Sequence, residues 1–178
     1  MKRVFGGIAV AVMLGACATS SDRVDAIATQ SVGFITSVVD ACVTPMEAGK
    51  TIAEHHGEAG EFRRNENPEA RVAAGLKDGD SVWNPVEAGP GVTIIESAGG
   101  CTVGVMAVPA SETVGMLAAL LRSGFDFSTP EFSSSQEARA VTTRQSKDVA
   151  GRKLNVVIVA MHVSTDFANL MATVGWQE

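Results

Sequence analysis

The side chains best suited to metal binding or general-base catalysis are the three histidines. His55 and His56 are adjacent, so on a helix they point about 100° apart and cannot share one metal ion. Glu54, Glu58 and Glu61 lie close to them in the sequence. This pattern is more typical of a solvated, charged helix end than of a metal site, and we predict no metal ligands here.

His162 stands at the end of an apolar segment and is followed by Asp166, with several serines nearby. A Ser-His-Asp triad can be drawn from these residues, which leaves a small periplasmic hydrolase with a site near His162 as an alternative function. The sequence contains no Gly-x-Ser-x-Gly elbow or other nucleophile signature. A partly buried histidine at a strand end is the simpler interpretation, so we assign no catalytic residue.

The glycine-rich and acidic motifs do not indicate a cofactor. Gly99-Gly100 lacks the lysine and the following helix of a phosphate-binding loop. Asp78-Gly79-Asp80 has too few spaced oxygen ligands for calcium. Without a catalytic, metal or cofactor motif, the sequence favours a protein that acts by binding rather than by catalysis.

The first residues of the chain form an export segment. Lys2 and Arg3 precede a mostly apolar run over residues 4–14, which is too short for a membrane-spanning helix of about 20 residues. Leu14-Gly15-Ala16-Cys17 then resembles the lipobox of bacterial lipoproteins. The resemblance implies a signal peptide over residues 1–16 and acylation of Cys17, for instance with palmitate, as the first mature residue.

The same resemblance implies a location. Ala18 is not the aspartate that retains enteric lipoproteins in the inner membrane, so we expect an outer-membrane protein that faces the periplasm. Several acyl chains on Cys17 would anchor it stably. The alternative is an ordinary signal peptide cut at an alanine-rich site, with Cys17 incidental.

Composition limits the partners. Residues 17–178 carry 12 basic and 20 acidic residues, so nucleic acid is a poor partner and anionic lipid would repel the chain. Aromatic residues make up 5% of the chain and tyrosine is absent, which disfavours sites that need stacking platforms. We therefore expect contact with the membrane through the anchor, together with an envelope protein partner.

Cys42 and Cys101 are left to pair in the oxidising periplasm. Cys42 lies on the apolar face of a helix predicted to start near Ser21 or Asp22. Cys101 lies on the apolar face of a predicted strand. A bond between them would close a loop of roughly 60 residues and contribute about 4 kcal/mol. Two buried reduced thiols are the alternative.

Two more helices are expected in the first two thirds of the chain. Thr44-Pro45-Met46-Glu47 has the form of a capping box, which predicts a helix from Pro45 to about His56 that meets the first helix at an angle. Residues 57–91 are predicted to be an exposed loop, with a weak helical turn around residues 69–76 and an extended piece at residues 82–85. Ser111-Glu112 predicts the start of another helix that ends at Gly124.

The expected strands form two hairpins. Residues 91–98 and 101–108 flank Gly99-Gly100, and a turn there pairs Ala98 with Cys101. After a serine-rich connection over residues 125–135, residues 138–146 predict an edge strand that Arg139 and Arg144 protect from unwanted pairing. Residues 154–163 are apolar on both faces and predict a central strand. Residues 167–176 predict a short helix from their apolar spacing.

This element order predicts an α+β fold, in which a small antiparallel sheet of two hairpins is packed by helices on one face. We find no internal repeat. The predicted organisation is a signal peptide (residues 1–16), a lipid anchor and tether (17–22) and a single periplasmic domain (23–178). The predicted function is that of a non-catalytic binding, adaptor or structural lipoprotein of the cell envelope.

Overall fold

The computed structural model describes residues 20–57, 60–67, 69, 72, 75–87, 91–137 and 139–177, with side chains from residue 25 onward. The predicted signal peptide, Cys17 and most of the helical turn predicted around residues 69–76 lie outside the described residues. Within them, an antiparallel sheet combines with helices, which confirms the α+β class.

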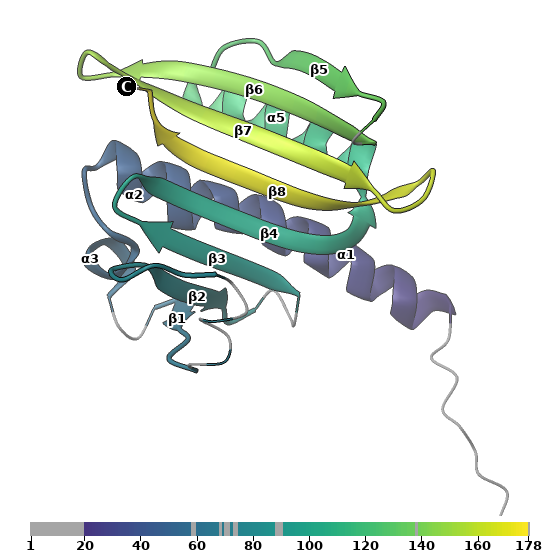
Figure 1. Cartoon of the computed structure of the whole chain (residues 1–178), viewed down its shortest axis with the longest axis horizontal. Coiled ribbons are helices and arrows are strands. Elements are labelled where there is room, and N and C mark those ends of the chain that lie inside the picture. The colour runs from purple at the N-terminus through teal and green to yellow at the C-terminus, as the bar shows by residue number, and fades with distance from the viewer. Residues whose placement is uncertain are drawn as a thin grey trace, which may run out of the picture.

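The described chain runs through two similar halves, each with a helical segment followed by four antiparallel strands (Figure 1). The first half contains α1 (Ser20–Thr36), η1 (Ser37–Val43), α2 (Thr44–Glu47), α3 (Ile52–His56), β1 (Phe62–Arg64), β2 (Ser81–Pro85), β3 (Val92–Ser97) and β4 (Gly100–Pro109). The second contains α5 (Ala110–Phe125), β5 (Glu131–Ser135), β6 (Ala140–Val149), β7 (Arg152–His162) and β8 (Phe167–Trp176).

The two halves join at the centre of one sheet. Its order is β1-β2-β3-β4-β8-β7-β6-β5, so each half is a meander and the last strands of the two halves, β4 and β8, pair antiparallel. The topology therefore contains a repeat that the sequence does not show.

The sheet is larger than the two predicted hairpins, because it contains four further strands, β1, β2, β5 and β8. β1 and β2 lie within the predicted loop 57–91, where β2 matches the extended piece predicted at residues 82–85, and β5 lies within the serine-rich connection. As a consequence β6, which covers most of the predicted edge strand 138–146, is an inner strand and β5 is the edge.

The predicted C-terminal helix is also a strand, β8. Its apolar residues fit a helical spacing, but Ala168, Leu170, Ala172 and Val174 alternate along the chain and are all buried. β8 pairs with β4 on one side and β7 on the other. The hydrogen bonds to these two strands therefore make residues 167–176 a strand, although their apolar spacing also fits a helix.

The β3–β4 hairpin has a different register from the predicted one. Ser97 pairs with Gly100 and Glu96 with Cys101, a shift of two residues that moves the turn to Ala98-Gly99. The shift preserves the faces of the strands, because side chains alternate with a period of two. A Cβ on Gly100 would lie 2.5 Å from the Val174 carbonyl oxygen, so this glycine permits the close approach of β8.

The first helix does not break at Pro45. α1 continues through η1, a π-helix, into α2, which ends at Glu47. Proline has no N–H to donate, and the wider π-helical turns let the helix pass this position. The predicted single helix over residues 45–56 is instead two short ones, because Gly49 takes a left-handed conformation and Thr51 starts α3 with a capping box to Glu54.

The helices lie behind the sheet in Figure 1, where α1 contacts β4 and α5 contacts β8. We call this side of the sheet the covered face. Its central side chains are all buried, and they are Ile94, Val103, Val105, Leu154, Val156, Ile158, Leu170 and Val174. The opposite side is the open face.

The helical stretch Asp25–Glu47 is long and apolar enough to cross a bilayer by length and composition, but half of it is buried within the described structure. A disulfide between Cys42 and Cys101 joins it to β4, with a Cα–Cα distance of 5.4 Å. Both cysteines are buried, as their predicted faces required. We therefore interpret this stretch as the core helix of the domain.

Candidate functional site

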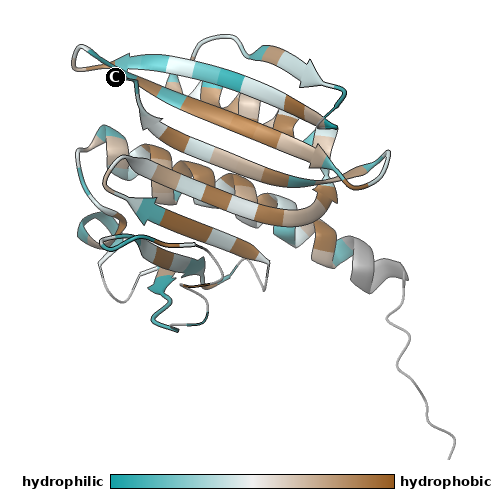
Figure 2. Ribbon diagram, viewed as in Figure 1, coloured by the Kyte–Doolittle hydropathy of each residue, from teal (hydrophilic) through white to brown (hydrophobic). Residues whose placement is uncertain are grey.

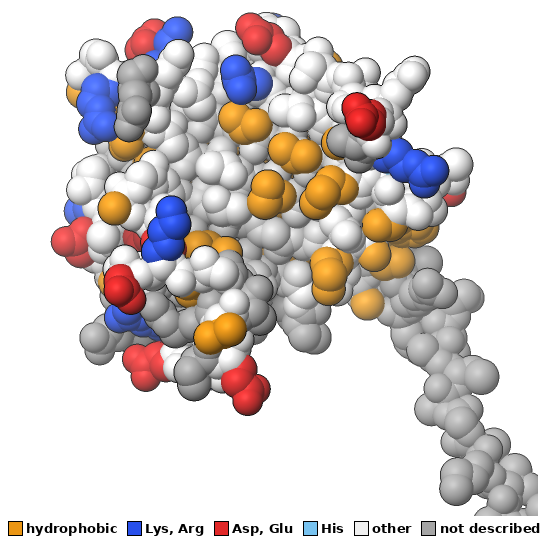
Figure 3. Space-filling model, viewed as in Figure 1, with side chains coloured by type: hydrophobic (Ala, Val, Ile, Leu, Met, Phe, Trp, Pro, Cys, Tyr) orange, Lys and Arg blue, Asp and Glu red, His pale blue; other side chains and the backbone are white. Residues whose placement is uncertain are grey.

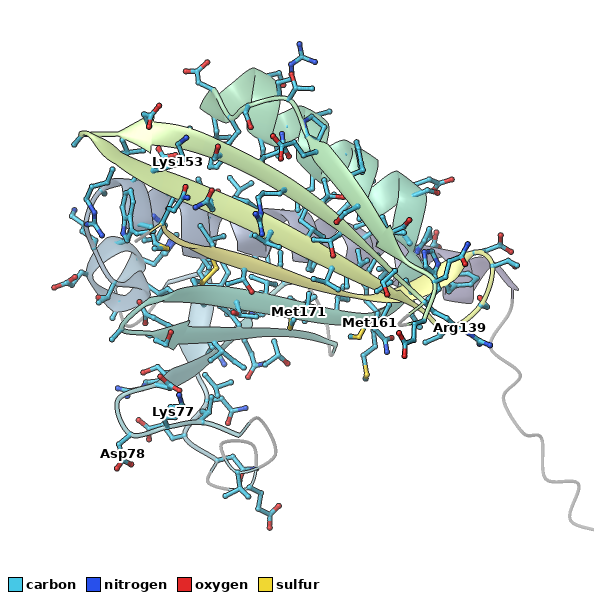
Figure 4. All side chains as sticks on the ribbon, turned by 45° about the horizontal axis from the view of Figure 1, so that its top comes forward. Lys77, Asp78, Arg139, Lys153, Met161 and Met171 are labelled. Atoms are coloured by element: carbon cyan, nitrogen blue, oxygen red, sulfur yellow. A yellow bond between two sulfur atoms is a disulfide. The ribbon has the colours of Figure 1, made fainter. Side chains whose placement is uncertain are left out.

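The open face carries an apolar patch across the three central strands. Met106 of β4, Met161 of β7 and Met171 of β8 are 67%, 44% and 41% exposed, and the half-buried Val157 and Val159 lie on the same face of β7, where Val159 is in register with Met171. We call these five residues the methionine patch. Figure 3 shows hydrophobic side chains gathered over these strands, and Figure 4 shows Met161 and Met171 on this face.

The patch follows from the alternation of side chains along each strand. Met171 lies between buried Leu170 and Ala172, so it must point to the open face. In register, Met171 lies opposite Val159 of β7 and Gly104 of β4. Figure 2 shows β7 hydrophobic along most of its length, as the sequence predicted for a central strand. An antiparallel sheet with one solvated face is normally polar on that face.

Opposite charges face each other across the strands beside the patch. On the open face, Arg144 of β6 is in register with Glu131 of β5, and Lys153 of β7 is in register with Asp148 of β6. These cross-strand pairs balance in charge. Arg139 lies near Met161 at the other end of the sheet (Figure 4). The two cross-strand pairs therefore cancel in charge, and Arg139 adds one positive charge, although the chain as a whole is acidic.

A cavity of about 580 Å³ lies at one end of the sheet, among the described residues. The α2–α3 connection, the β3–β4 and β6–β7 turns and the end of β8 surround it. Its apolar lining includes Ala41, Pro45, Met46, Ala98 and Trp176. Its volume is in the range of small-molecule sites, about 300–1,000 Å³.

The two carboxylates that line this cavity are engaged by the protein. Glu96 accepts hydrogen bonds from the Ile52 N–H (2.7 Å) and from Trp83 Nε1 (3.0 Å). Glu54 accepts from the Thr51 N–H (2.8 Å) and from the Thr51 hydroxyl (3.0 Å). These bonds to Thr51 hold the pKa of Glu54 below its ordinary value. Both carboxylates therefore stabilise the fold around the cavity.

The two cations at this cavity are exposed and differently placed. Arg152 lies over the Trp176 ring, 4.3 Å from its centroid, in a cation–π contact. Lys50 lies in the α2–α3 connection and contributes to the low pKa of Glu54. Within the described part of the chain, neither cation has a carboxylate within 4 Å.

A smaller cavity of about 200 Å³ lies beside η1 and is lined by Asp40, Glu61 and Glu87. Burial raises the pKa of Asp40, and Glu61 adds to this effect. The hydroxyl of Ser37, which lines the same cavity, is buried without a hydrogen-bond partner. The described residues contain no cluster of three or more His, Cys, Asp or Glu side chains that could hold a metal ion.

The rings of His55 and His56 contact each other edge-on, with their centroids 4.8 Å apart, whereas His162 lies far from them. The ring nitrogen Nε2 of His56 lies 2.8 Å from the Asp40 carbonyl oxygen, and the ring packs against Phe62. His162 is exposed, not partly buried, and lines neither cavity. It pairs with Ala168 on β8, six residues from Val174, which pairs with Cys101. His162 and the disulfide are thus about 20 Å apart along the strand.

The sequence predicted neither the methionine patch nor the large cavity. The methionine patch depends on β8, which we predicted as a helix, and the large cavity depends on three connections and the end of β8, which meet at one end of the sheet. The alternation of residues 168–174 was the available signal for the first. Comparison of the chain with protein-family models, characterised proteins and solved structures finds no match.

Proposed function

We propose that this protein is a lipid-anchored lipoprotein of the bacterial envelope that binds a partner protein on the open face of its sheet. The observation that carries the proposal is the methionine patch. Methionine side chains are flexible and polarizable, so they adapt to partner surfaces of different shape. Exposed apolar patches on a folded domain mark interaction sites.

The anchor is supported by the sequence and by the layout of the domain. Cys17 of the proposed lipobox lies three residues before α1, so the tether between lipid and helix is at most about 10 Å long. Side chains of residues 25–30 are exposed or half-buried, and burial starts at Ser31. Figure 1 shows this part of α1 extending past the sheet. This exposed end of α1 would hold the sheet away from the membrane. Because the helices pack on the covered face, the open face would remain free to bind a partner.

The charges beside the patch specify the partner. Arg144 and Glu131, and likewise Lys153 and Asp148, oppose each other in sign, so the strand pairs beside the patch do not favour a strongly charged surface, and Arg139 adds only one positive charge. We therefore propose a protein with an apolar, nearly neutral contact surface. The chain as a whole is acidic, which disfavours association between two copies outside this face.

Site-specific photocrosslinking in intact cells tests the proposed surface. A photoreactive residue at position 171 should give an adduct of one discrete mass, and the same residue at position 116 should not. Met116 is the matched control, because it is a methionine that is 50% exposed on α5, on the other side of the sheet.

Dependence on the patch completes the test. Met161→Asp should remove the adduct formed from position 171, whereas Met116→Asp should leave it. The captured protein, once purified, should bind the Met161→Asp variant at least about tenfold more weakly than the wild type. An adduct of twice the chain mass, or equal capture from both positions, would contradict the proposal.

The anchor has a separate test, the intact mass of the protein extracted from native membranes. The proposal expects a chain that begins at Cys17 and carries acyl mass, with Cys42 and Cys101 alkylated only after reduction. A chain without acyl groups would refute the anchor.

A further inference from the structure

We propose that the 580 Å³ cavity is a binding site for a small organic anion, whose carboxylate or phosphate group is held by Arg152 and Lys50. The inference does not depend on the proposed function. The cavity lies at the Gly100–Gly175 end of the β4–β8 pair, and Met161 is in register with Asn169 near the other end.

Arg152 is arranged to receive an anion. Its guanidinium is held 4.3 Å from the centroid of the Trp176 ring, and a stacked guanidinium keeps its N–H donors free at its edge. That edge can bond both oxygens of a carboxylate or phosphate at once. Trp176 is itself half-buried and lines the cavity, so the arginine is positioned before a ligand arrives.

The two carboxylates that line the cavity oppose an anion by their charge, but the protein already engages their oxygens. Glu96 uses both carboxylate oxygens in hydrogen bonds to the protein, and Glu54 uses one of its oxygens to cap α3. The cations, in contrast, have no salt-bridge partner in the described ranges. The N–H donors of the two cations are therefore available to a ligand, whereas three of the four carboxylate oxygens already accept hydrogen bonds from the protein.

The apolar lining specifies the rest of the ligand. Pro45, Met46, Ala98 and the exposed edge of Trp176 can contact a compact apolar body, while the two cations hold its charged group. Apolar walls with a few convergent polar groups are the usual composition of small-molecule sites. The geometry does not distinguish a carboxylate from a phosphate, so the experiment below includes both.

Titration of the full mature chain with benzoate and with phenyl phosphate tests the site, and benzamide is the neutral analogue. The chain has two tryptophans, so its indole N–H region in an NMR spectrum contains two signals, and Trp176→Phe identifies the one from the cavity. Saturable movement of the Trp176 signal with either anion, and none with benzamide, supports the proposal. Binding of benzoate alone identifies a carboxylate site, and binding of phenyl phosphate alone a phosphate site.

Matched variants complete the experiment. Arg152→Gln should weaken binding about tenfold or more, since it removes charge-assisted hydrogen bonds, and Lys50→Gln should weaken it less. Lys153→Gln is the control, because Lys153 is also exposed and adjacent in sequence but does not line the cavity. The site is refuted if no ligand gives a saturable shift, if benzamide binds as well as benzoate, or if Arg152→Gln binds like the wild type.

Discussion

The two faces of the sheet differ in how their apolar side chains are used. On the covered face, branched side chains such as Ile94, Ile158 and Leu170 are almost fully buried under α1 and α5. On the open face, unbranched methionines lie exposed between threonines and glycines. On β8, Leu170 and Met171 belong to opposite faces although they are one residue apart. Stability therefore resides on one face, while the other is free to change its contacts without loss of the fold.

Removal of the disulfide should have the largest effect on the free energy of unfolding, because the bond fixes the helical layer to the covered face. The double variant Cys42→Ala/Cys101→Ala loses the constraint on a loop with a sequence separation of 59 residues. We expect the free energy of unfolding to fall by about 4 kcal/mol, measured by urea denaturation. Reduction of the wild type should give a similar loss, and the reduced variant should show no further change. Equal stability with and without the bond would contradict this role.

Neighbouring residues of β8 give the most direct comparison of the faces. Leu170→Ala should lower the free energy of unfolding by about 3 kcal/mol, because it leaves a cavity under the helices. Met171→Ala should lower it by less than about 1 kcal/mol, because the methionine is 41% exposed. Urea denaturation measures both. Similar losses for the two variants would show that something covers the open face in the isolated protein.

Substitution of Asp40 should have a smaller effect on the free energy of unfolding, and this effect should depend on pH. Its pKa is raised by burial, so the folded state holds this proton more tightly than the unfolded chain does. The stability that it contributes is present below its ordinary pKa and is lost as the pH rises through the folded-state pKa. Asp40→Asn should remove this loss, so its advantage over the wild type should grow with pH in urea unfolding between about pH 3 and 7.

Glu54 provides a control of the opposite sign. Its pKa is lowered by the Thr51 hydrogen bonds, so its stabilisation is present above its ordinary pKa and is lost as the pH falls through the folded-state pKa. Glu54→Gln should therefore be less stable than the wild type at neutral pH. An identical pH profile for wild type and Asp40→Asn would contradict the assignment to Asp40.

Sequence patterns predicted the structure correctly where a segment carried a single local signal. α5, the central strand β7 and the inward faces of Cys42 and Cys101 all follow from such signals. Two competing signals produced the error at α3. Thr44-x-x-Glu47 and Thr51-x-x-Glu54 have the same capping-box pattern, and only the second forms the box.

Long-range pairing accounts for the other errors. β8 satisfies both periodicities, and its partners β4 and β7 decide in favour of a strand. β5, with five exposed residues, has no apolar pattern and exists through its pairing with β6. The methionine patch and the large cavity are assembled from such pairings, so no local pattern predicts them.

The sheet order also affects how the chain reaches its final fold. β8 follows the other seven described strands in the sequence, yet it fills the gap between β4 and β7. Until β8 pairs, the folding chain consists of two partial sheets, each with an unpaired strand at the future centre. Such edges are prone to pair with other chains. The chain is therefore most vulnerable to misassembly while β8 is unpaired, and removal of β8 would leave β4 and β7 as permanent edges.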